Sequence, residues 1–364
     1  MLLLWTGFIV FVLAMLALDL GVFHRKAHIV QMKEALGWSA VWITLGLAFS
    51  FFIYHAYNGH WFGLGSAVDA VDGLANSGRT AAIKYLTGYV VEKSLSVDNI
   101  FVIAMIFGFF AVPAIYQHRV LFWGILGALV MRGAMIAVGA ALIAKFHWIL
   151  YIFGGFLILT GAKMLFMHSG AEDPDRNIMV RLVRKIFPVT ERFHGQHFIV
   201  RAGSIASRKG VLPGDEESGD SVVASAKKGA VLLTPLALAL IVVEATDLIF
   251  AVDSIPAIFA ITADPFLVFT SNVFAILGLR SLYFALAGML DKFRYLKVAL
   301  AVVLMVVGVK MLTATWLKSV LGDHFNFILL GVILSILAAG ILLSLLANRR
   351  DARRGAERKR KHPR

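Results

Sequence analysis

The chain has 364 residues and is 59% hydrophobic, and its mean hydropathy is +0.81, which excludes an ordinary soluble globular domain. It contains no cysteine, so disulfides, thiolate metal sites and thiol redox chemistry are excluded. The net charge of +13 does not indicate nucleic-acid binding, because Lys and Arg cluster between apolar segments and in the tail.

Apolar segments of about 20 residues recur along the chain, and each is long enough to cross a hydrocarbon core of roughly 30 Å. The first begins without basic residues and continues into Asp19, so we interpret it as a retained span and not as a cleaved signal peptide. The sequence therefore predicts an all-α polytopic membrane protein with nine transmembrane helices, near residues 3–23, 37–55, 84–110, 120–143, 147–167, 230–262, 267–289, 296–316 and 325–347.

The spans divide the chain into six parts, and the basic residues orient them. With the N-terminus outside, 26 of the 35 Lys and Arg residues face the cytoplasm, so the positive-inside rule predicts a cytoplasmic C-terminus. The parts are two N-terminal helices (1–60), a three-helix unit (84–167), a cytoplasmic loop (168–229), a second three-helix unit (230–316), a last helix (325–347) and a basic tail (348–364).

The two three-helix units share short motifs in the same order. Each unit has three spans, an odd number, so the second copy enters the membrane upside down relative to the first. Such inverted repeats are a recurrent plan of secondary transporters. The alternative is a chance match, since membrane sequences have low complexity. The matching pairs are EKSLSVDNI (92–100) with DLIFAVDSI (247–255), ILG (125–127) with ILG (276–278), and GAKML (161–165) with GVKML (308–312).

Acidic residues lie deep inside these spans, where each costs roughly 2.5–3.5 kcal/mol. Residues 240–259 carry three, whose cost of about 7–10 kcal/mol exceeds the roughly 3–7 kcal/mol gained by the apolar residues. That helix therefore needs partner helices, protonation or a cation. The candidate metal site that we predict between the two units comprises Glu92, Asp98, Asn99, Glu244, Asp247, Asp253 and Ser254.

The donors of this candidate site are all hard oxygens, which suit magnesium, calcium or manganese and argue against zinc or copper. Two acids six residues apart differ by about 120° around a helix, so they converge only if the helix is interrupted. Pro256 predicts such an interruption, which would free the carbonyl of Val252. Alternatively, the acids are protonated or paired with the buried bases Lys93, Arg132, Lys163, Arg280 and Lys310.

The same motifs resemble the TerC/Alx family of bacterial and plastid membrane proteins. The most specific matching runs are residues 87–101, 243–259, 269–280 and 291–297, and the resemblance covers nearly the whole chain. It implies a bacterial inner-membrane protein of metal homeostasis, linked by its family name to tellurium resistance, with manganese export as its activity. The family's membrane acids correspond to Glu92, Asp98, Glu244, Asp247 and Asp253. Residues 204–228 depart from the pattern, being longer and richer in Ser and Gly.

Our leading interpretation is a Mn²⁺ exporter that works by alternating access, with no tightly bound cofactor and with a proton or sodium counter-ion. The alternative is a membrane scaffold that helps to insert or assemble other proteins, as suggested for plastid relatives. An enzyme is not expected, because the chain lacks Gly-x-Gly-Asp and His-Glu-x-x-His motifs and an evident Ser–His pair. Expected partners are the lipid bilayer and a divalent cation, and the oligomeric state is left open.

Overall fold

The computed structural model describes residues 2–21, 31–146, 148–166, 188–202, 221–286, 295–313, 316–317 and 325–361. Within these ranges the chain is helical almost throughout, and its two short strands form one small sheet. The all-α membrane class predicted from the sequence is confirmed.

The N-terminal half consists mainly of long helices. Ser77 begins the third of them, because its side chain accepts a hydrogen bond from the backbone N–H of Thr80 at 3.3 Å. The elements are α1 (Leu2–Gly21), α2 (Met32–Asn58), the 3₁₀ turn η1 (Trp61–Gly63), α3 (Gly78–Phe109), α4 (Ala114–Lys145) and α5 (Ile149–Phe166).

The C-terminal half begins with the sheet and continues in helices. The expected span at 230–262 starts later than predicted, because Val231–Leu233 pairs antiparallel with Ile199–Arg201. Thr234 then caps the helix and Pro235 opens it, a position where the missing N–H of proline costs nothing. The elements are β1 (Ile199–Arg201), α8 (Ser221–Ser225), β2 (Val231–Leu233), α9 (Pro235–Phe259), α10 (Pro265–Ile276), α11 (Leu279–Leu286), α12 (Leu296–Leu312) and α14 (Phe325–Lys361).

Each of the nine expected spans overlaps a helix, and the span at 267–289 overlaps the pair α10 and α11. Among the described residues, five helices are long and apolar enough to cross a membrane. The number rises to six if α10 and α11, which bend by 40° at their junction, form one broken span. The count of nine spans stays a prediction.

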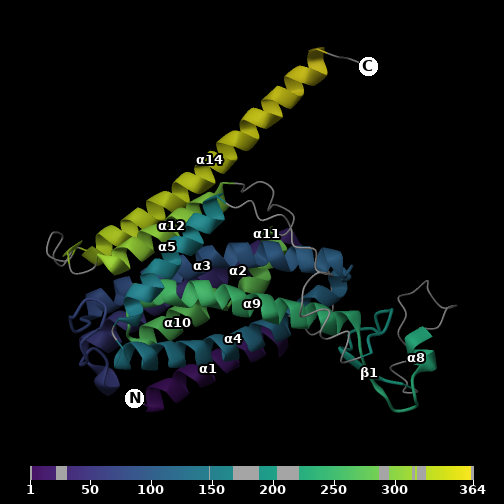
Figure 1. Cartoon of the computed structure of the whole chain (residues 1–364), viewed down its shortest axis with the longest axis horizontal. Helices are drawn as coiled ribbons and strands as arrows, with labels where there is room; N and C mark the ends of the chain where they lie inside the picture. The colour runs from purple at the N-terminus through teal and green to yellow at the C-terminus, as the bar shows by residue number, and fades with distance from the viewer. Residues whose placement is uncertain are drawn as a thin grey trace.

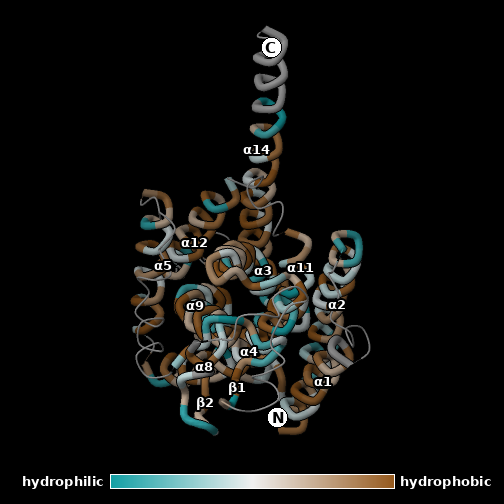
Figure 2. The backbone as a smooth tube through the Cα atoms, turned by 90° about the vertical axis from the view of Figure 1, so that its right-hand side faces the viewer, coloured by the Kyte–Doolittle hydropathy of each residue, from teal (hydrophilic) through white to brown (hydrophobic). Residues whose placement is uncertain are grey.

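The helices pack around α3 and α9, which lie in the middle of the bundle, with α5 and α12 on one side and α1 and α2 on the other (Figure 2). α9 packs against α4 and α3, and α3 also packs against α10 and α2. α14 runs on beyond the bundle, and β1 and α8 lie near the start of α9 (Figure 1). Polar residues on α3 and α9 therefore face other helices at the centre of the protein.

The interruption predicted at Pro256 is wrong, since α9 continues from Pro235 to Phe259. Pro256 lies within the last turn, where the loss of one helical hydrogen bond is least disruptive. The break lies instead in the next span, at Leu277 and Gly278, and Gly278 has the positive φ of 82° that glycine adopts without strain.

Candidate functional site

The centre of the bundle holds a buried guanidinium that binds carboxylates from two other helices. Arg132 of α4 donates from Nη2 to Oδ1 of Asp247 at 2.9 Å, and from Nε to Oδ2 of the same carboxylate at 3.1 Å. Its Nη1 pairs with Oε1 of Glu92 and lies 3.4 Å from Oγ of Ser254. Arg132 is 2% exposed and Glu92 is 1% exposed. This charge-assisted network therefore joins α3, α4 and α9 in a largely buried environment.

Helical geometry explains which predicted residues meet there. Glu92 and Asn99 are seven residues apart on α3, and Asp247 and Ser254 are seven apart on α9, so each pair shares a face to within about 20°. Asn99 donates from Nδ2 to Oδ1 of Asp247 at 3.4 Å. The structure thus gathers four of the seven predicted residues around Arg132, and these four are equivalent positions of the repeated motif. We call them, with Arg132, the central cluster.

Glu244 lies one turn before Asp247 on α9, and its carboxylate packs directly against Gly127 of α4. A side chain at Gly127 would collide with that carboxylate, so the glycine makes room for it. Oε2 of Glu244 and Oε2 of Glu92 are buried and accept no hydrogen bond from the described residues. Buried acceptors without partners are costly, so these two oxygens are suited to a proton or a cation.

Of the remaining two predicted residues, Asp253 lies away from the central cluster and the side chain of Asp98 is not described. Asp253 lies on another side of α9, where its Oδ1 accepts a hydrogen bond from Thr160 of α5 at 3.4 Å. The six-residue spacing from Asp247 rotates it away, as expected for an uninterrupted helix. Asp98 belongs to α3, and its side chain lies outside the described residues. Across the described ranges, no three acidic or histidine side chains lie close enough together to hold a metal ion.

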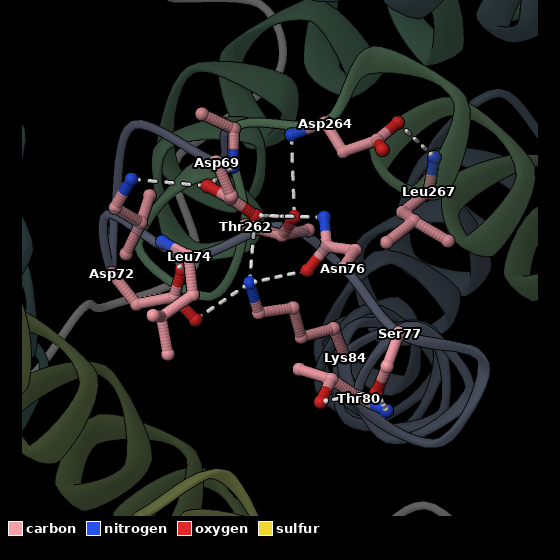
Figure 3. Close-up of polar contacts among 12 residues, drawn as sticks. Asp69, Asp72, Leu74, Asn76, Ser77, Thr80, Lys84, Thr262, Asp264 and Leu267 are labelled. Carbon is pink, nitrogen blue, oxygen red and sulfur yellow. Dashed lines mark hydrogen bonds and ion pairs between the residues drawn. The ribbon is translucent and has the colours of Figure 1, made fainter. Parts of the chain in front are cut away.

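A second polar cluster, which the sequence did not predict, connects the segment between α2 and α3 to the rest of the bundle (Figure 3). Lys84 of α3 donates to Asp69 at 2.8 Å and to Asn76 at 2.7 Å, and it forms an ion pair with Asp72 at 2.7 Å. The side chains of Lys84 and Asp69 are fully buried. Asp69 also accepts hydrogen bonds from the Thr262 hydroxyl and from the backbone N–H of Ala263. We call this the loop cluster.

Each of the two carboxylate oxygens of Asp69 accepts hydrogen bonds from at least two donors, so little capacity remains for a metal ion. Burial alone would raise the pKa of Asp69. The Lys84 ammonium and the hydrogen bonds from Lys84, Thr262 and Ala263 outweigh it and lower that pKa below 3.8. The cluster is therefore a structural tie. Asp69 and Thr262 are 193 residues apart, and no local pattern marks them as partners.

Next to the loop cluster, Asp264 caps α10 through bonds from the N–H groups of Phe266 and Leu267. Its other oxygen accepts a hydrogen bond from the Tyr57 hydroxyl at 2.8 Å. Burial, together with the nearby Asp69 charge, raises the pKa of Asp264 in spite of these bonds. Asp69 and Asp264 line a pocket of about 660 Å³, whose other walls are mostly apolar.

The comparison with known proteins agrees with the membrane architecture. The sequence pattern of the integral membrane protein TerC family matches residues 77–352. The chain belongs to the TerC family. It is 47% identical to an uncharacterised membrane protein of Myxococcus xanthus, over 95% of this chain and 93% of that one. No solved structure matches it.

A second relative of this TerC protein carries a functional name. The chain is 42% identical to Alx of Escherichia coli strain K12, which is named as a proposed membrane-bound redox modulator, over 97% of this chain and 98% of Alx. The family resemblance noted in the sequence is confirmed, and so is a multi-pass protein in contact with the bilayer. These names do not state that an ion is transported, how the chain is oriented or what any acidic residue does.

Proposed function

We propose that this TerC protein exports a hard divalent cation, Mn²⁺, across the bacterial inner membrane by alternating access. One observation carries the proposal: Glu92 and Asp247, equivalent positions of two related units, meet at a single buried guanidinium. Ionisable side chains inside a membrane are costly to bury and generally line ion pathways. The cluster also lies where transporters with inverted repeats hold their substrate, at the interface of the repeats.

The packing of the helices supports the inverted repeat. If α3 corresponds to α9, α4 to α10–α11, and α5 to α12, exchanging the units turns the α3–α10 contact into the α9–α4 contact, and both contacts exist. The α5–α12 contact maps onto itself. A pseudo-two-fold axis between two related units produces this reciprocity.

Small residues at the α5–α12 contact follow the same exchange. A Cβ added to Gly154 would lie 3.1 Å from the carbonyl oxygen of Gly308, and one added to Gly161 would lie 2.7 Å from that of Ala301. The motif match pairs residue 161 with 308, and the same shift pairs 154 with 301. Each close contact is therefore the image of the other, which favours a true duplication over a chance match.

In this proposal Arg132 is a tethered cation that neutralises the site between transport events. Glu92, Asp247 and the neighbouring Glu244 are three carboxyl groups against one guanidinium, so the site retains capacity for a further cation or for protons. Mn²⁺ takes carboxylate oxygens together with neutral oxygens, which Asn99 and Ser254 provide. Cargo binding requires Arg132 to release at least one carboxylate. Return of the guanidinium then helps to expel the ion on the other side.

The orientation proposed from the basic residues places the N-terminus outside and the tail after Asn348 in the cytoplasm. The relatives' redox name does not require a thiol reaction in this chain, because the chain has no cysteine. A change in the metal content of the cell would alter redox balance without one.

The test is flux of Mn²⁺ into liposomes that contain the purified protein and a manganese-sensitive dye. We expect Glu92→Gln and Asp247→Asn to lower the rate at least tenfold. Glu34→Gln, the same change at the start of α2 and outside both clusters, should leave the rate unchanged. Size-exclusion profiles establish that all proteins are folded.

Two results would reject the proposal. Wild-type flux no greater than that of empty liposomes rejects transport and favours a scaffold. Equal flux in wild type and both acid variants rejects the central cluster as the site.

A further inference from the structure

The broken span α10–α11 leaves backbone carbonyls inside the bundle without helical partners. α10 ends at Ile276, and Leu277 and Gly278 separate it from α11. The break requires glycine at residue 278, because a side chain there would lie 2.5 Å from Trp42 of α2 and because φ is +82°. The carbonyl end of a helix carries a partial negative charge, so the end of α10 attracts cations.

Lys93 of α3 occupies this position. Its Nζ donates to the carbonyl oxygen of Ala275 at 3.0 Å and lies 3.4 Å from that of Leu277. None of the ion pairs between described residues includes Lys93. Among the described residues, Lys93 is thus held by neutral backbone oxygens, whereas Arg132, on the other side of α3, is held by carboxylates.

Asn272, in the C-terminal half of α10, supplies a second observation. It lies one turn before Ala275 and Ile276 on the same side of the helix, and it is 1% exposed. Neither its amide nitrogen nor its amide oxygen has a hydrogen-bond partner among the described residues. A buried amide with both groups unsatisfied is costly, and a cation would satisfy its oxygen.

We propose that the end of α10 binds Na⁺, and that the Lys93 ammonium takes the place of this ion in the state seen here. Neutral oxygens suit a monovalent ion, because a divalent ion needs carboxylates to offset its dehydration. Unwound backbone at the end of a broken membrane helix is a recurrent Na⁺ ligand in transporters. Resting on the proposed export, this site supplies the counter-ion.

The two sites are linked through consecutive residues of α3. Glu92 faces Arg132 and α9, whereas its neighbour Lys93 faces the end of α10. Na⁺ that displaces Lys93 moves the segment of α3 that also positions Glu92. Binding of the counter-ion therefore alters the pairing of Glu92 with Arg132, and the cargo site responds.

The experiment measures the melting temperature of the purified full chain in detergent as NaCl replaces choline chloride at constant ionic strength. Lys93→Gln removes the competing ammonium, so the Na⁺ concentration for half-maximal stabilisation should fall at least tenfold below that of wild type. Lys93→Arg keeps a tethered cation and should behave as wild type. Adding Asn272→Leu to Lys93→Gln should raise the half-maximal concentration again, by severalfold.

Flux measurements give a second readout. An opposed Na⁺ gradient should accelerate Mn²⁺ flux by wild type, and Lys93→Gln should lose this dependence. If Lys93→Gln does not fold, Lys93→Met, which keeps the aliphatic stem, takes its place in both assays.

In the melting assay, the inference is overturned if Lys93→Gln needs as much Na⁺ as wild type for half-maximal stabilisation, or if choline stabilises the variant equally. Mn²⁺ flux that ignores Na⁺ in all proteins overturns the counter-ion site and leaves the proposed export intact. Stabilisation of Lys93→Gln by Na⁺ without any Mn²⁺ flux overturns the export and leaves the Na⁺ site.

Discussion

Replacing Arg132 by Met tests whether the central cluster is held together by one guanidinium. The side chain is 2% exposed, and its carboxylate partners Glu92 and Asp247 have side chains that are 1% and 13% exposed. Removing one partner of a buried ion pair typically costs about 3–5 kcal/mol. Since domains are stable by about 5–15 kcal/mol, this loss is a large fraction of the total. We expect a melting temperature lower by roughly 5–10 °C.

The matched variant removes all three charges together, as Glu92→Gln, Arg132→Met and Asp247→Asn. Without an uncompensated buried charge, its stability should return to within about 1 kcal/mol of wild type, since buried ion pairs contribute little net stability over neutral side chains. Its Mn²⁺ flux should nevertheless be absent, which separates the folding role of the cluster from its transport role.

The assay is thermal unfolding of the purified proteins in one detergent at neutral pH, together with liposome flux. A single Arg132→Met variant as stable as wild type would refute the reasoning. So would a triple variant no more stable than the single one, because the acids would then not be the source of the loss.

Three further outcomes are expected. Gly127→Ala should displace the Glu244 carboxylate and raise the Mn²⁺ concentration for half-maximal flux severalfold. Adding the shorter Glu244→Asp to the same protein should restore the wild-type value. Wild-type behaviour of Gly127→Ala alone would contradict the contact. Asp253→Asn should affect Mn²⁺ flux less than the same change at residue 247, because Asp253 does not contact Arg132; parallel titrations compare them. Asp69 has a pKa lower in the folded chain than in the unfolded one, so its ionised form stabilises the fold at neutral pH, and this contribution is lost as the pH falls through the folded pKa. Asp69→Asn should therefore lower the melting temperature at pH 7, with a difference from wild type that narrows below about pH 4; a constant difference would argue against the charge.

The sequence predicted the acidic residues of the central cluster but not the way they meet. The repeated motif draws attention to acids six residues apart, such as Asp247 and Asp253, whereas an unbroken helix aligns residues seven apart. Asn99 and Ser254, which carry no charge, belong to the central cluster because they lie seven residues after Glu92 and Asp247. Arg132 was one of five buried bases in the sequence, and only the packing of α9 against both α4 and α3 selects it.

The loop cluster was beyond sequence reasoning for a different reason. Asp69 and Asp72 precede α3 in a glycine-containing connection, where acids are common and usually solvated. Their partner Lys84 lies in the first turns of α3, and Thr262 belongs to a distant connection. The break at Gly278 was equally hidden, because proline signals a break locally, whereas the positive φ of Gly278 and its closeness to Trp42 are visible only in the folded chain.

The seam between α5 and α12 brings the two backbones close together at Gly154, Gly161 and Gly308. Interlocked side chains resist rolling, because each must change its rotamer before the helices can shift. At this seam Leu312 lies over Gly154, Met305 over Gly161 and Ile158 over Gly308, so each glycine receives a side chain of the other helix. A seam interlocked in this way keeps the two helices in register, so the pair moves as one body.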